Sequence, residues 1–354
     1  MSSRIATYTD FSRQGIINSR MRIIHKLLLH GVLTRKALCD RLNVSMATMT
    51  NHAQDLITNK ILLSRTIPGI HSNRPIQELS LNSDFGICST IKLQPHEISA
   101  ELVNLDSTLI KTIKIPVKAP TQEELFAALE ESAEKLEAFA TARGEKIIHG
   151  VLGFHGIASP ANQAIFSMDG ISDWEPCSPF HFLQYFAANP IYDLSTWIMA
   201  KCKGFSHERQ CDHHIGIVEF CNSTFHIAVI DNEQIILGHL GTSSPYLHCE
   251  VKNGLACYCG KKNCFNAYIK NGGFDPKIIQ EGLHRIFKKT NLSIIGLEFI
   301  EHLETAKNLC HNNSSVNLIL VRNGDELYQD GLRILAAENA WKRILNTLYM
   351  QTKK

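Results

Sequence analysis

The sequence predicts a mixed α/β protein made of a small N-terminal three-helix module with a β-hairpin and a larger two-lobed α/β domain. Three observations lead to this fold class. Residues 1–82 show helical periodicity followed by two short alternating segments. From residue 83 onward, alternating strands are followed by a long amphipathic helix and buried strands. Residues 248–267 gather cysteines and a histidine around a glycine, which indicates a tight turn with special chemistry.

The composition is that of a globular protein from a reducing compartment. With 354 residues, 44% of them hydrophobic, the chain is long enough for two or three domains. Eleven cysteines, an odd number, do not suggest a disulfide framework. The first residues lack the apolar core of a signal peptide, and no apolar run is long enough to span a bilayer. We therefore expect a cytoplasmic protein without membrane insertion.

Charge is distributed unevenly along the chain. The net charge is only +2, but residues 1–80 carry 11 Lys and Arg against 4 Asp and Glu, a balance of +7. The remainder therefore carries a balance of −5. A basic end on an otherwise slightly acidic chain favours a polyanionic partner for that end.

The N-terminal module is predicted from periodicity and caps. Residues 17–30 form a helix whose apolar side chains share one face, namely Ile17, Met21, Ile24, Leu27 and Leu28. Gly31 ends this helix, and Thr34 caps a second one that runs to about Leu42. After a tight turn, Ser45 caps a third helix from Met46 to about residue 59. Strands at residues 61–66 and 76–81 complete the module as a wing.

This order is a winged helix-turn-helix, which places the start of its last helix in the DNA major groove. The candidates for base contact are the residues that face away from the core at that start, with the cap included: Ser45, Ala47, Thr48, Asn51 and His52. Asn pairs with adenine, and Thr or Ala methyls contact thymine. Phosphate candidates are Arg35, Lys36 and Lys60, together with Arg74 at the wing tip. The alternative is an interaction module that never contacts DNA, with Asn51 and His52 merely solvated.

The larger domain opens with strands at residues 87–93, 98–105 and 109–117, a helix at 122–142 and a strand at 147–154. Three strands, a helix and a strand are the opening of an actin-like nucleotide-binding half domain. A kinase of that type needs a turn rich in Gly and Asp between the first two strands, so that the backbone can approach phosphates. The turn here, KLQPHE, has neither residue. We therefore expect no nucleotide binding and no enzyme activity.

The cysteine-rich stretch predicts a structural zinc site. Cys257, Cys259 and Cys264 form C-x-C-x4-C, and Gly260 allows the backbone to reverse between them. His248 is the expected fourth ligand, and the adjacent Cys249 is its competitor. Four protein ligands close the coordination sphere and leave no position for a reactive water. The alternative is a loop of ordinary reduced thiols.

The remaining elements divide the domain into lobes of about residues 83–190 and 191–330 and a C-terminal helix within 331–354. Asp193 follows a short strand and precedes a helix at 194–203. Further strands are expected at 215–220, 225–231, 234–237 and 316–322, and helices at 179–188, 265–270, 276–288, 297–309 and 338–349.

The order of winged helix, actin-like strands, Asp before a helix, and His followed by C-x-C-G-x3-C resembles the ROK family of repressors and sugar kinases, nearest to the regulator branch of Mlc and NagC. The resemblance implies that His248, Cys257, Cys259 and Cys264 are zinc ligands and that Asp193 takes the place of the sugar-site Asp. The wing residues 73–75, NRP, resemble the family's G-R-P. The chain departs from the family where E-x-G-H should precede the zinc site, since Pro245 replaces the Glu. It is divergent and shortened.

These features together predict a zinc-stabilised transcriptional regulator, a repressor of genes linked to carbohydrate uptake or metabolism. It would bind double-stranded DNA as a homodimer or higher oligomer and sense a signal through a degenerate ROK domain, in which Asp193 serves as a helix cap or a ligand. One alternative is a sugar kinase with an added DNA-binding domain, in which Asp193 is the general base. Another is a regulator whose inducer is a transporter protein and not a sugar, as the resemblance to Mlc implies.

Overall fold

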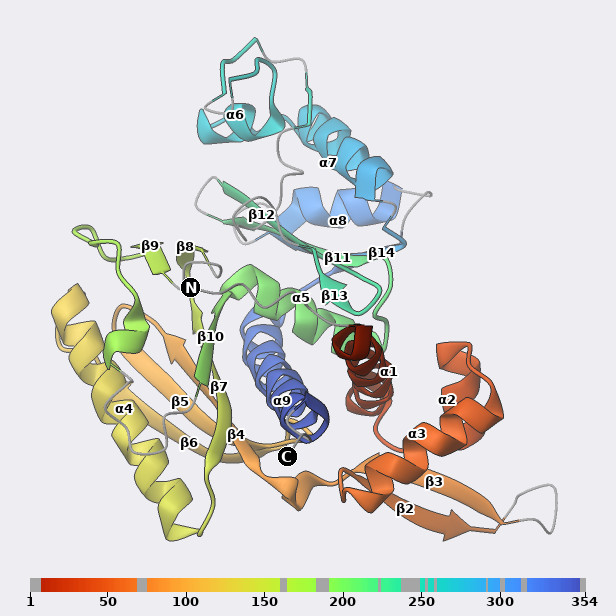
Figure 1. The fold of residues 1–354 in the computed structure, drawn as a ribbon. Helices are drawn as coiled ribbons and strands as arrows, with labels where there is room; N and C mark the ends of the chain where they lie inside the picture. Colours follow the sequence, from red (N-terminus) through yellow and green to blue (C-terminus); the bar gives the residue numbers. More distant parts are fainter. Residues whose placement is uncertain are drawn as a thin grey trace.

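The structure, a computed structural model, describes residues 8–68, 75–159, 164–182, 191–221, 224–236, 249–251, 254–257, 260–290, 292–299, 303–312 and 317–350. Figure 1 shows an N-terminal module, two lobes and a long C-terminal helix, α9, that runs between them. None of the helices in the described ranges is both long and apolar enough to cross a membrane.

The N-terminal module has the predicted helix-turn-helix and wing. Its elements are α1 (Tyr8–His30), β1 (Leu33–Thr34), α2 (Arg35–Leu42), α3 (Met46–Thr58), β2 (Leu62–Ile67) and β3 (Ile76–Leu81). Thr34 and Ser45 cap α2 and α3 as expected, each accepting a backbone N–H at 3.1 Å. Asn43 turns the chain between them with a φ of 51°. The helix α1 begins well before residue 17, and the two-residue β1, which was not predicted, pairs with β3.

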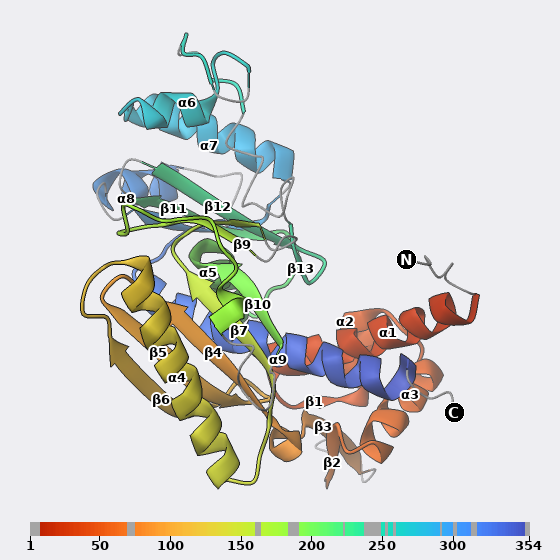
Figure 2. The same ribbon diagram turned by 60° about the vertical axis from the view of Figure 1, so that its left-hand side comes forward.

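Lobe one is a five-stranded sheet between two helices. Its strands, in the order β10-β7-β4-β5-β6, are β4 (Ile87–Leu93), β5 (Glu97–Asn104), β6 (Leu109–Pro116), β7 (Ile147–Phe154) and β10 (Ile191–Thr196). Strands β7 and β10 run parallel to β4, while β5 and β6 are antiparallel neighbours. Helix α4 (Gln122–Ala142) covers one face, and α9 covers the other (Figure 2). A small hairpin, β8 (Gly156–Ser159) with β9 (Ala164–Met168), extends from the end of β7, and the short helices η1 (Ser83–Phe85) and η3 (Pro179–Phe182) complete the lobe.

Lobe two is a second five-stranded sheet with strand order β13-β12-β11-β14-β15. The strands are β11 (Ile215–Cys221), β12 (Thr224–Asp231), β13 (Gln234–Ile235), β14 (Ile294–Phe299) and β15 (Asn317–Leu320). Its helices are α5 (Trp197–Glu208), α6 (Phe265–Lys270), α7 (Pro276–Thr290) and α8 (Leu303–Asn312). The helix predicted at residues 297–309 is wrong in part, because its first residues belong to β14 in the buried sheet. Tertiary pairing with β11 outweighed the helical period there.

Helix α9 (Gly324–Met350) is far longer than the predicted helix at residues 338–349. It crosses α5 at very short range, since a Cβ on Gly331 would lie 1.7 Å from the Ala200 carbonyl oxygen. Trp341 is fully buried and donates its indole N–H to the Leu105 carbonyl at 2.7 Å. Because α9 also packs against α1, it contacts the N-terminal module and both lobes.

Candidate nucleic-acid interface and buried ion pairs

The first turns of α3 present an exposed polar surface. Ala47, Thr48 and Asn51 are exposed and His52 is half-buried. Met49, Ala53 and Leu56 form the buried face of the same helix. The structure therefore brings four of the predicted base-contact residues together on the side of α3 that faces away from the core.

Ser45 and His52 take more restricted roles than the others. The Ser45 hydroxyl accepts the Thr48 backbone N–H and also bonds the Thr48 hydroxyl at 2.9 Å, so its capacity is used in capping α3. Burial lowers the pKa of His52, and the nearby Arg20 guanidinium lowers it further. His52 is therefore neutral at neutral pH, with one ring nitrogen as donor and the other as acceptor.

The predicted phosphate contacts lie partly in the described residues. Arg35 and Lys36 form the first turn of α2, where Lys36 is exposed and Arg35 is half-buried. Cations are unfavourable beside the positive end of a helix dipole, so this placement does not serve the stability of α2. It does suit an external anion. Arg74, with the rest of the NRP segment up to residue 74, lies outside the described residues.

A contact that the sequence did not reveal ties α3 to α1 and α9. Asp55 forms an ion pair with Arg20 of α1, Nη2 to Oδ2, at 2.9 Å. The Tyr349 hydroxyl, near the end of α9, donates to the same carboxylate oxygen. Since 294 positions separate Tyr349 from Asp55, no local pattern could have indicated the contact.

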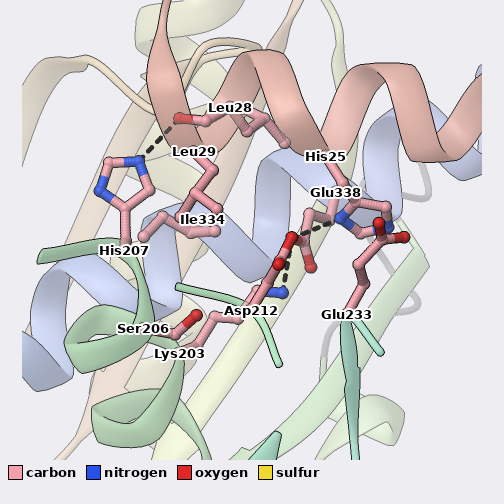
Figure 3. A pocket seen from close by; sticks show the side chains of 10 residues that line it. All are labelled: His25, Leu28, Leu29, Lys203, Ser206, His207, Asp212, Glu233, Ile334 and Glu338. Atoms are coloured by element: carbon pink, nitrogen blue, oxygen red, sulfur yellow. Dashed lines mark hydrogen bonds and ion pairs between the residues drawn. The ribbon is translucent and has the colours of Figure 1, made fainter. Parts of the chain in front are cut away.

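Charged side chains also join α1 to helices α5 and α9. Figure 3 shows His25 of α1, Lys203 of α5 and Glu338 of α9 converging, with Glu338 Oε1 at 2.8 Å from His25 Nδ1 and 2.6 Å from Lys203 Nζ. Burial raises the pKa of Glu338, but Lys203 and His25 outweigh burial and lower it to about 2. Beside this group, Lys26 pairs with Asp212 and lies 3.4 Å from Glu233.

The turn between β4 and β5, where an actin-like kinase would hold phosphate, is closed by packing. The Gln94 N–H is used by the Glu97 carbonyl at 3.1 Å, and Pro95 has no N–H to offer. A Cβ on Gly170 would lie 2.6 Å from the Pro95 ring, so the proline packs tightly against the segment after β9. Neither Gln94 nor Pro95 therefore offers a backbone N–H to a phosphate.

Lobe two contains a cluster of buried ion pairs. Lys201 of α5 is buried between two carboxylates: Glu298 Oε2 lies 2.9 Å from its Nζ, and Glu219 Oε2 lies at 2.5 Å. Burial alone would lower the pKa of Lys201, but these carboxylates outweigh it and raise the pKa. Trp197 donates to Glu219 at 2.9 Å and stacks on His155, and burial lowers the pKa of His155 to about 4. The sequence gave no signal for this cluster, whose members come from α5, β11, β14 and the residue between β7 and β8.

Contrary to the prediction from the sequence, Asp193 does not lie directly before a helix. It lies within β10, paired with Val151 of β7, and Thr196 is the residue directly before α5. The expected role of Asp193 as a cap of that helix is therefore wrong. Its Oδ2 accepts hydrogen bonds at 2.9 Å from His149 of β7 and from Asn339, in the middle of α9. The strand continued because Leu194 and Ser195 extend the parallel pairing with β7.

The cysteine-rich stretch is described in part. Cys257 and Cys264 are both buried in one small cluster, and Gly260 between them has a φ of 83°, as the predicted reversal requires. His248 and Cys259 lie outside the described residues, as does Pro245. Cys249 belongs instead to the core of lobe two, where its thiol lies 3.6 Å from the Gly282 carbonyl oxygen. Two converging thiols at a glycine turn suit the donor chemistry of zinc.

Comparison with known proteins gives a fold and no closer relationship. No family model and no curated protein sequence matches the chain. Among solved structures, a ROK family transcriptional regulator, a homologue of the E. coli Mlc protein, superposes with a TM-score of 0.64 over 95% of this chain and 99% of its own, at 14% identity. The mixed α/β fold with two actin-like lobes is therefore the fold of ROK proteins.

Two ROK sugar kinases share the lobes. The ROK hexokinase from Thermus thermophilus has a TM-score of 0.53 at 17% identity and covers 71% of this chain and 98% of its own. The ROK glucokinase from Streptomyces griseus, solved with glucose and AMPPNP, has a TM-score of 0.50 at 14% identity, with 71% and 99% covered. The match to the regulator thus includes about a quarter of this chain that the matches to the kinases leave out. That share is comparable in size to the N-terminal module.

Proposed function

We propose that this protein is a DNA-binding transcriptional regulator that reads its target with α3. The observation that carries the proposal is the exposed surface of Ala47, Thr48 and Asn51 at the start of a capped helix in a basic helix-turn-helix module. The likeness to a ROK regulator over 95% of the chain supports the same conclusion. Asn51 suits a bidentate pair with adenine, and the Thr48 and Ala47 methyls suit thymine.

We assign the phosphate contacts of this module to Arg35, Lys36 and Arg74. His52 and Ser45 lie at the edge of the reading surface, which is formed by Ala47, Thr48 and Asn51. We assign the protein to the cytoplasm and infer that it binds as a homodimer, because helix-turn-helix proteins commonly read two half-sites one helical turn apart. We also propose that it represses genes linked to carbohydrate uptake or metabolism, and the likeness to a ROK regulator supports a regulatory role.

We further propose that the protein is not a kinase. In the β4–β5 turn, Gln94 uses its N–H internally and Pro95 has none, and Lys201 is buried between Glu219 and Glu298. A coupled assay with ATP and several hexoses tests this directly, and phosphorylation of any hexose would contradict it. Asp193, the residue first considered as a general base, is engaged by His149 and Asn339 instead.

The proposed zinc ion has a structural role. Cys257 and Cys264, with His248 and Cys259, would hold it, and the ion would cross-link the turn that leads into α6. Four protein ligands supply folding free energy and leave no coordination site for chemistry.

DNA binding is tested with the purified full-length chain and duplexes from its own promoter region, followed by fluorescence anisotropy between 50 and 200 mM salt. We expect affinity to fall steeply with salt, and Lys36→Ala to make the slope shallower by about one unit. Asn51→Ala should cost about 1–3 kcal/mol at one base position and relax the preference there. Lys135→Ala, an exposed lysine on α4, is the matched control and should change nothing. Salt-independent binding, or none, would refute the proposal.

Whether a sugar is the inducer is tested by calorimetry of the full-length protein with hexoses and amino sugars. Saturable heat would support a sugar inducer. Absence of heat, together with release of DNA by a sugar-transporter domain, would support a protein inducer.

A further inference from the structure

The end of helix α9 reaches the helix that carries the proposed reading surface. Tyr349 lies in the last turn of α9, and its hydroxyl donates to Asp55 in the third turn of α3. Its ring lies under the Arg20 guanidinium, with Arg20 Cζ 4.2 Å from the ring centroid. Arg20 in turn holds Asp55, so the three side chains form one closed group from α1, α3 and α9.

The position of Asp55 on α3 links this contact to the direction of Asn51. Side chains four apart lie on the same side of a helix, so Asn51, Asp55 and Asn59 form one stripe. Asn59 extends the stripe by donating its side-chain amide to the Asp55 carbonyl at 2.9 Å. A partner that holds Asp55 therefore sets the rotation of α3 about its axis, and with it the direction in which Asn51 points.

Burying Arg20 in this group of side chains costs folding free energy. Arg20 is only 8% exposed, and its Nε and Nη1 atoms are buried without a hydrogen-bond partner within the described part of the chain. Burying polar nitrogens unpaired is unfavourable, so simple stability does not explain an arginine here. Burial raises the pKa of Tyr349, and its hydrogen bond to Asp55 raises it further, which keeps the hydroxyl a donor at physiological pH.

We propose that Tyr349 is a positioning residue for sequence reading, which fixes the orientation of α3 on the body through Asp55. The inference rests on the proposed DNA-binding function and adds a residue from the opposite end of the chain to it. Without the Tyr349 hydroxyl, α3 samples other orientations, and the fraction of protein ready to read DNA falls. Apparent affinity falls by the same fraction, while contacts to phosphates remain possible in every orientation.

The test compares Tyr349→Phe and Asp55→Asn in the full-length chain on two duplexes: the tightest one selected from a randomised library, and a scrambled duplex of equal length. We expect each variant to bind the selected duplex about threefold to tenfold more weakly. Affinity for the scrambled duplex and the salt slope should stay unchanged. The double variant should lose no more than the worse single variant, because both changes remove the same contact.

Thr347→Ala is the matched control, since this hydroxyl of the same helix turn donates only to the Arg343 carbonyl of α9 itself. Thermal unfolding of every variant shows that the chains are folded. If the wild-type chain binds neither duplex, the proposed function itself fails, and the inference fails with it. If the wild-type chain binds and Tyr349→Phe matches it on the selected duplex, or weakens both duplexes equally, the positioning role alone is refuted.

Discussion

Replacing Glu338 by Gln should remove a large share of the stability of the junction between α1 and α9. The folded-state pKa of Glu338 is about 2, against an ordinary value of 4.5. A depressed folded-state pKa contributes stability that is present above the unfolded pKa and is lost as pH falls toward the folded one. The difference is worth about 3 kcal/mol at pH 7, falling to roughly half of that near pH 3. Loss of one partner from a buried ion pair costs a similar amount, ~3–5 kcal/mol.

The assay is guanidinium denaturation of the wild type and Glu338→Gln at several pH values from 7 down to the lowest at which both chains fold. The free-energy difference should be greatest at neutral pH and shrink steadily below pH 5. Glu131→Gln is the control, because its pair with Lys135 is half-exposed and should contribute less than about 1 kcal/mol. A difference below about 1 kcal/mol at pH 7, or one that does not change with pH, would refute the reasoning.

Three further changes test other parts of the structure. Glu233→Gly and Glu233→Ala both lose the Lys26 contact. Because residue 233 has a φ of 70°, the Gly variant should be more stable than the Ala variant by about 1 kcal/mol in denaturant melts. Equal stabilities of the two variants would contradict this. Lys201→Met leaves two buried carboxylates facing each other and should destabilise the chain by ~3–5 kcal/mol in the same assay, whereas a change below ~1 kcal/mol would show that the cluster is solvated. Cys257→Ser should abolish bound zinc in elemental analysis while Cys211→Ser retains it, and equal metal content in both would exclude Cys257 as a ligand.

Local features of the fold were predictable because short-range physics determines them. Thr34 and Ser45 cap helices because their hydroxyls satisfy backbone N–H groups within three residues, and this requires no knowledge of the rest of the chain. The same is true of the reversal at Gly260, which depends on one residue's access to positive φ. The exposed face of α3 followed from the spacing of Met49, Ala53 and Leu56.

Features that depend on distant partners were not predictable in this way. Asp193 resembled a residue at a strand end, but pairing with β7 carries β10 on to Thr196, and a strand ends where its neighbour stops pairing. The pairing of Lys201 with Glu219 and Glu298 joins α5, β11 and β14, and none of these residues stands in a recognisable motif. The first half of α9 is a different case, because its sequence does carry a helical period: Leu327, Tyr328 and Gly331 are buried, whereas Asp325, Glu326 and Asp330 are exposed.

Helix α9 joins both lobes to the N-terminal module. It begins beside β4, where Lys92 lies 4.9 Å from the centre of the Tyr328 ring, and ends at Asp55 on α3. Over its 27 residues it spans about 40 Å as one helix. Because Glu338 and Tyr349 both tie it to the N-terminal module, the orientation of α3 is a property of the whole chain and not of the module alone. Under the proposed function, the two lobes therefore take part in reading DNA through this orientation.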